Sequence, residues 1–121
     1  MKKEAIIYWA ATGILSLMML FSAYGYFTSP DMKAAFVHLG FPDYFRVELG
    51  VAKILGVAAL LLPMVPATVK NFAYAGFAII FVSASFAHFS SGDAISGVIT
   101  PLVMLGLLAV SYTYSSKLAT A

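Results

Sequence analysis

Three long stretches of the chain are apolar and carry no formal charge: residues 6–27, 72–89 and 94–114. At about 1.5 Å per helical residue, the first stretch measures roughly 33 Å, which matches a bilayer hydrocarbon core of about 30 Å. We therefore predict a membrane-spanning helix over each stretch. A cleaved signal peptide is the alternative for the first, because Lys2 and Lys3 precede it and Ala23-Tyr24-Gly25 resembles a cleavage site.

A further span, second in chain order, is predicted over residues 44–62, although polar residues interrupt it. Asp43 is expected to cap its first turn through a carboxylate oxygen, and Pro63 ends it. Asp93 is expected to cap the last span in the same way. Three charged residues lie inside the second span: Arg46, Glu48 and Lys53.

The segment between the first two spans has the pattern of a short amphipathic helix over residues 30–39. Ser29 is a good N-terminal cap, Pro30 fits the first helical position, and Gly40 ends the run. We expect this helix to lie on the outer membrane surface or to cover the end of the bundle. Its apolar residues recur at helical spacing: Met32, Ala35, Phe36 and Leu39.

Composition indicates that lipid is the solvent for most of the chain. The 121 residues are 62% apolar and 10% charged, with a mean hydropathy of +0.95, whereas soluble domains are about 45–50% apolar and about 25% charged. So small a chain cannot bury that much apolar surface inside itself. The predicted fold is all-α: one domain over residues 1–121, a transmembrane four-helix bundle with a short outer helix.

Charge distribution orients the predicted spans. If successive spans cross the membrane in alternating directions, four lysines near span ends lie on the same side of the membrane. An excess of positive charge marks the cytoplasmic side, which predicts that both termini are cytoplasmic. The basic residues form no run, so we expect no nucleic-acid partner. The chain contains no cysteine, which excludes disulfides, thiolate metal sites and iron–sulfur ligation. The four lysines are Lys2, Lys3, Lys70 and Lys117.

Lys53 is the most unusual residue because it lies roughly 15 Å along the second predicted span. A lysine at the centre of a span costs about 2.5–3.5 kcal/mol on insertion scales, so its ammonium needs a partner. The other spans contain no acid, and Glu48 is five residues away, a poor offset for pairing. The ammonium therefore snorkels outward, bonds carbonyls or hydroxyls, or meets a ligand.

The remaining polar residues concentrate on the outer side, where His38 and His88 both fall. A haem held by these two histidines is disfavoured because the chain has no attachment motif. We find no phosphate loop, no Ser-His-Asp spacing and no metal-ligand spacing. The sequence therefore predicts no catalytic residue and no metal site, and a lone histidine at a helix end is commonly a solvated surface group.

Several motifs together resemble the DoxX-like family of small four-helix bacterial membrane proteins. They are Gly40-Phe41-Pro42, Glu48-x-Gly50-x-x-Lys53-x-x-Gly56, Lys70-x-x-Ala73-Tyr74-Ala75-Gly76, and His88 followed by Gly92-Asp93. The family is named after a membrane subunit of a thiosulfate:quinone oxidoreductase. The resemblance implies a location in the bacterial cytoplasmic membrane and an association with a membrane oxidoreductase.

The sequence thus favours a non-catalytic accessory membrane protein beside a quinone-linked redox partner. Its hypothetical ligand site is a polar outer pocket of Arg46, Glu48, Lys53 and His88, with a quinone as the candidate ligand. Two alternatives stay open: permeation of a small solute or of protons, and a purely structural scaffold. A homo-oligomer is also compatible with the sequence.

Overall fold

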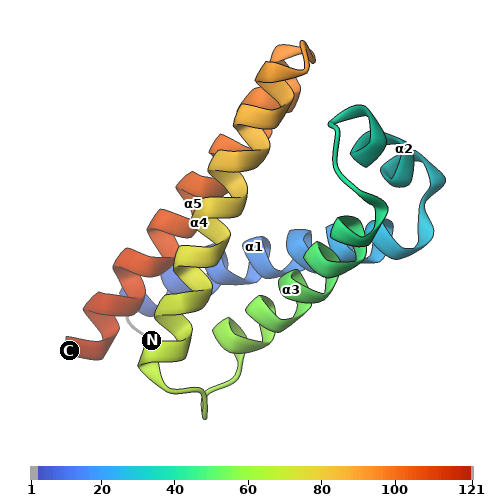
Figure 1. Ribbon diagram of the computed structural model, residues 1–121. Helices are drawn as coiled ribbons and strands as arrows, with labels where there is room; N and C mark the ends of the chain where they lie inside the picture. The colour runs from blue at the N-terminus through green and yellow to red at the C-terminus, as the bar shows by residue number, and fades with distance from the viewer. Residues whose placement is uncertain (1–2, 121) are drawn as a thin grey trace.

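The computed structural model describes the backbone of residues 3–120 and the side chains of residues 3–118. Lys2, which entered the charge count, lies outside the described residues. The described chain is helical and contains no strand (Figure 1). Its elements in order are α1 (Lys3–Thr28), α2 (Pro30–His38), α3 (Asp43–Leu61), α4 (Ala67–Ser90) and α5 (Ile95–Thr120).

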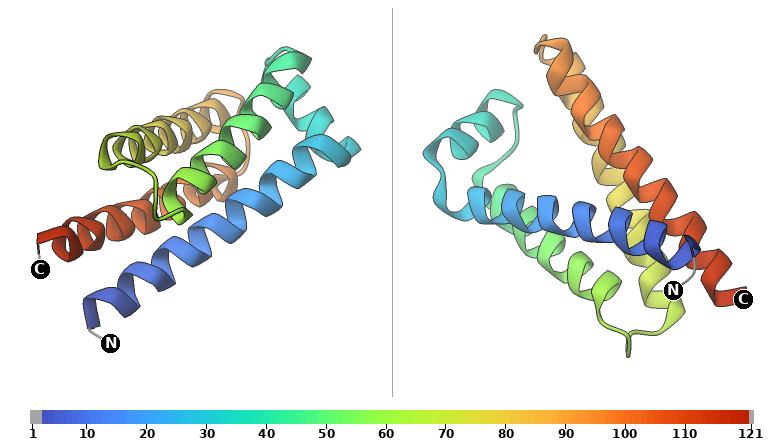
Figure 2. Two further views of the ribbon diagram at one scale, coloured as in Figure 1. Left: turned by 90° about the horizontal axis from the view of Figure 1, so that it is seen from below. Right: turned by 180° about the vertical axis from the view of Figure 1, so that it is seen from behind.

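The four long helices pack as a ring in which each has two neighbours. α1 lies beside α3 and α5, and α4 lies beside α5 and α3. α1 with α3 and α4 with α5 form two pairs that cross obliquely, so that they meet at one end and separate toward the other (Figures 1 and 2). The start of α1, the end of α5 and the α3–α4 turn lie at the closed end, whereas α2 and the α4–α5 turn lie at the open end.

Three helices in the described chain are long and apolar enough to cross a membrane: α1, α4 and α5. α3 has 19 residues but carries Arg46, Glu48 and Lys53. Large apolar side chains cover the outside of the molecule; Phe21, Phe72 and Phe86 are each at least 70% exposed. Such a surface suits hydrocarbon rather than water, as expected of an integral membrane protein in contact with lipid.

An apolar cluster joins the helix pairs near the closed end. Gly56 of α3 permits a close approach of α4, because a Cβ atom there would lie 2.6 Å from the ring of Phe77. A hydroxyl chain also crosses this region: Ser111 Oγ lies 2.6 Å from both Thr12 Oγ1 and Tyr74 OH. The buried members of the apolar cluster are Leu15, Met19, Val57, Leu60, Tyr74, Phe77, Phe81, Met104 and Leu108.

The helix ends confirm some expected caps and correct others. Ser29 caps α2 by accepting from the Met32 amide, as predicted. The expectation for Asp43 was wrong: Pro42 is the cap residue of α3, without a side-chain bond, because the Asp43 carboxylate pairs with Arg46 instead. Asp93 also pairs elsewhere, two residues before α5 begins.

Lys70 fixes the turn between α3 and α4. Its Nζ atom donates to the carbonyl oxygens of Ala59, Leu60 and Leu62, at 3.0, 3.2 and 3.1 Å. The last carbonyls of a helix have no partner within the helix and carry partial negative charge, so an ammonium there is stabilising. α4 begins at Ala67, five residues before the predicted start of its span at residue 72, so Lys70 lies in its first turns.

Candidate functional site

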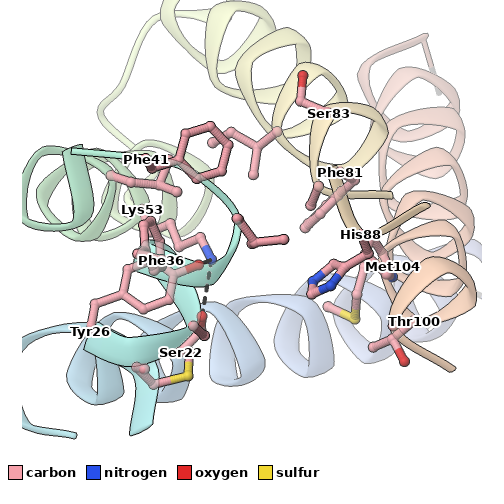
Figure 3. A pocket seen from close by; sticks show the side chains of 18 of the residues that line it. Ser22, Tyr26, Phe36, Phe41, Lys53, Phe81, Ser83, His88, Thr100 and Met104 are labelled. Atoms are coloured by element: carbon pink, nitrogen blue, oxygen red, sulfur yellow. Dashed lines mark hydrogen bonds between the residues drawn. The ribbon is translucent and has the colours of Figure 1, made fainter. Parts of the chain in front are cut away.

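A cavity of about 690 Å³ lies between the diverging helix pairs, on the side covered by α2 (Figure 3). Most of its wall is apolar, and several aromatic rings face it. Two side chains that carry or can acquire positive charge line it: Lys53 from α3 and His88 from α4. Prominent members of the apolar wall are Met19, Phe36, Phe41, Phe45, Leu49, Ile80, Phe81 and Met104.

Lys53 is buried, with 4% of its surface exposed, and its partners come from α1. Its Nζ atom donates to Tyr26 OH at 2.6 Å and to Ser22 Oγ at 3.0 Å. The same atom lies 4.3 Å from the centroid of the Tyr26 ring, a cation–π contact. Ser22 and Tyr26 are four residues apart and therefore lie on one face of α1.

An ammonium group has three N–H donors. Two of them are used by Ser22 and Tyr26, and the third has no hydrogen-bond partner among the residues that the structure describes. The sequence left open whether the Lys53 ammonium group snorkels outward, bonds carbonyls or hydroxyls, or meets a ligand. In the structure its partners are these two hydroxyl groups. Because Lys53 also lines the cavity (Figure 3), one donor is available to a molecule bound there.

Arg46 and Glu48 do not line this cavity. Arg46 Nη2 lies 3.1 Å from Asp43 Oδ1, and its Nη1 atom donates to the Tyr26 carbonyl. This tie fixes the end of α1 against the start of α3. Glu48 is exposed on the outside of α3. The structure therefore brings together Lys53 and His88 and leaves the other two predicted site residues apart.

Asp93 bridges two histidines at the open end of the molecule. Its Oδ2 atom lies 2.7 Å from His88 Nδ1, and its Oδ1 atom lies 2.6 Å from His38 Nε2. His38 belongs to α2, whose backbone lies beside α1 and α3 but not beside α4 or α5. The bridge therefore ties α2 to the α4–α5 turn. Within residues 3–120, no group of three potential ligands is arranged to hold a metal ion.

Hydrogen bonds from His88 and His38 lower the pKa of Asp93 below its ordinary value of 3.8. A carboxyl with a lowered pKa in the folded state contributes stability above its unfolded-state pKa. That contribution is lost as the pH falls through the lowered value. The bridge is therefore expected to persist through mildly acidic solution.

This pH dependence is measurable as a distance between spin labels on two exposed residues, Ala34→Cys in α2 and Ala94→Cys beyond the turn. The chain has no other cysteine. We expect one short distance down to about pH 4 and a longer, broader distribution only below the ordinary carboxyl pKa. In an Asp93→Asn background, the distribution should be independent of pH. Detachment well above pH 4 in the unsubstituted background would contradict the bridge.

Sequence reasoning missed Ser22, Tyr26 and the role of Asp93. A signal for the first two existed, because hydroxyl side chains recur along one side of the apolar first span at Tyr8, Thr12 and Ser16 and again at Ser22 and Tyr26. In a membrane helix such residues often bond a neighbouring helix. No sequence signal identified α3 as that neighbour, and none paired Asp93 with His38, 55 residues away.

Comparison with protein families gives a match that covers most of the chain. The model of the DoxX-like family matches residues 10–111, a range that includes every residue lining the cavity and all of the histidine–aspartate bridge. Searches of the curated proteins and of the solved structures return no significant match.

Proposed function

Because the chain belongs to the DoxX-like family, we propose that it is a four-span protein of the bacterial cytoplasmic membrane that binds a quinone. It would serve as a non-catalytic accessory subunit of a membrane oxidoreductase. Both termini would be cytoplasmic. Lys3, Lys70 and Lys117 support this orientation because they occur near helix ends at the closed end of the molecule.

α3 is the proposed fourth span. Its 19 residues measure roughly 28 Å, close to the thickness of the hydrocarbon core. Its charges argue against insertion only if they lack partners. Lys53 has two hydroxyl partners from α1, and Arg46 has a carboxylate and a carbonyl. Glu48 is five residues from the start of the helix, where its carboxylate can reach the interface.

The observation that carries the binding proposal is the apolar cavity with Lys53 in one wall and His88 in another. Its volume of about 690 Å³ lies within the range of about 300–1,000 Å³ that is typical of small-molecule sites. A quinone ring is flat, apolar on both faces and polar at two carbonyl oxygens. The aromatic wall suits the faces, and the two polar residues suit the oxygens.

Each polar residue has a distinct proposed role. The unused N–H of Lys53 would donate to a quinone oxygen, a charge-assisted hydrogen bond. Nδ1 of His88 pairs with Asp93, so Nε2 is the ring nitrogen left to face a ligand. That atom would accept a hydrogen bond from the hydroxyl group of the reduced, quinol form.

Permeation is less well supported than binding. The cavity ends toward the closed end of the molecule at a buried apolar cluster that includes Leu15, Phe77 and Leu108. Such a cluster opposes the passage of ions or polar solutes, since an ion within it would lose its hydration.

The test is a titration of the purified chain in lipid nanodiscs with a benzoquinone that carries a ten-carbon tail. We expect saturable binding above the linear uptake of empty nanodiscs. A simple hydrocarbon such as decylbenzene, which lacks the carbonyl oxygens, should not compete. Uptake that never exceeds that of empty nanodiscs would refute the proposed function.

A further inference from the structure

The cavity is covered on the side of the α4–α5 turn. Met32, Ala35, Phe36 and Leu39 of α2 line it there. Asp93 holds this helix through His38 and at the same time bonds His88 in the cavity wall. A ligand arriving from the aqueous phase would have to displace α2 and break this bridge.

The side between α3 and α4 is different. These helices contact each other closely where Gly56 meets Phe77, and beyond that point they separate toward the open end (Figures 1 and 2). Ile79 and Ser83 of α4 line the cavity and are also exposed on the outside of the molecule, Ile79 by 66%. A side chain that borders both spaces marks the edge of an opening. Figure 3 shows Ser83 at the rim, with its hydroxyl group directed away from the centre of the cavity.

This opening faces lipid rather than water. Ile79 lies near the middle of α4, a helix of 24 residues that is long and apolar enough to cross a membrane. Its exposed neighbours Val82 and Phe86 are also apolar. At that depth the surrounding medium is hydrocarbon.

We propose that the cavity is filled laterally from the bilayer, through the opening between α3 and α4. The inference rests on the proposed function and narrows its ligand to a class: a membrane-dissolved quinone with an aliphatic tail. The ring occupies the cavity between Lys53 and His88, and the tail leaves through the opening beside Ile79 into the lipid. α2 then acts as a fixed cover and does not need to move.

Two changes separate the lateral route from the aqueous one. Ile79→Trp narrows the proposed opening, and Val82→Trp places the same bulk on an exposed position of α4 that does not line the cavity. Independently, a bifunctional thiol reagent can fix α2 covalently to the region of the α4–α5 turn in the Ala34→Cys/Ala94→Cys double variant, because the chain has no other cysteine. These two exposed positions do not line the cavity, so the histidine–aspartate bridge stays intact.

The readout is the association rate of the ten-carbon-tailed benzoquinone in nanodiscs. Ile79→Trp should slow association about tenfold or more, within the range that binding-site variants span, and Val82→Trp should not slow it. Cross-linking α2 should leave the rate unchanged. If cross-linking blocks association, or if the two tryptophan variants behave alike, the lateral route is refuted while quinone binding stands. If the unsubstituted chain shows no saturable binding, the proposed function fails, and this inference with it.

Discussion

Replacing Lys53 with methionine is expected to abolish saturable binding of the tailed benzoquinone, or to weaken it by about tenfold or more. A hydrogen bond from a charged donor contributes about 1.5–3 kcal/mol, and about 1.4 kcal/mol is a factor of ten in Kd. Methionine keeps the length and the apolar stem of the side chain. The loss would therefore report the ammonium group rather than the shape of the cavity.

The same substitution should change the stability of the fold little. Replacing a buried charge by an apolar side chain of similar volume is often neutral or stabilising. The hydroxyl groups of Ser22 and Tyr26 both lose their bonds from Lys53. Ser22 can instead bond the carbonyl four residues earlier in its helix, and Tyr26 lines the cavity, where a water molecule can bond its hydroxyl group. The Lys53→Met variant should therefore lose quinone affinity while its thermal stability changes little.

Titration and thermal unfolding in nanodiscs measure these two effects. Lys33→Met is the matched control, because Lys33 is exposed on α2 and does not line the cavity. Unchanged quinone affinity in Lys53→Met would refute a role for the ammonium in binding. An equal loss of affinity in Lys33→Met would point to surface charge instead.

Replacing Ser111 with valine is expected to lower the stability of the fold by about 2–6 kcal/mol. Ser111 is fully buried, and its hydroxyl group bonds both Thr12 and Tyr74. The substitution leaves two buried hydroxyl groups without this partner, at about 1–3 kcal/mol each. The effect should be large because these bonds join α1, α4 and α5 where the helix pairs meet.

Thermal unfolding in detergent, followed by loss of the helical circular dichroism signal, measures this effect. Thr113→Ala is the control on the same helix, since Thr113 is exposed. We expect a clearly lower midpoint for Ser111→Val and almost no change for Thr113→Ala. Equal midpoints for the two variants would mean that the hydroxyl chain contributes nothing to the fold.

The helices were predictable because membrane spans leave a strong signal in the sequence. Uncharged apolar runs predicted α1, α4 and α5, and Pro63 predicted the end of α3, which lies two residues before it at Leu61. The ends were less predictable where polar residues continue a helix beyond the lipid. α5 extends to Thr120 rather than residue 114, since nothing in its polar last turn breaks a helix.

Half of the predicted site lies at the cavity, and helix geometry explains why Glu48 does not. Arg46 is two turns before Lys53, on nearly the same face. Its guanidinium group, however, is bonded to Asp43 and to the Tyr26 carbonyl. Lys53 was identifiable as a lone charge deep in an apolar segment. Glu48 is five residues earlier, roughly 140° around the helix, so the two side chains cannot face the same interior. His88 was identifiable only as a polar residue near a helix end. Its inclusion in the cavity depends on the angle between the helix pairs, which the periodicity of a single chain does not encode.

The central claim is that a quinone ring lies between Lys53 and His88, and photolabelling locates that ring most directly. A tailed benzoquinone that carries an azide on its ring is bound in nanodiscs, illuminated, and its attachment sites are identified by mass spectrometry of the peptides. The account predicts labels on the cavity-lining parts of α1, α3 and α4, around Tyr26, Lys53 and His88, which excess unlabelled quinone suppresses. Labels confined to outward-facing residues such as Phe72, and insensitive to competition, would contradict it.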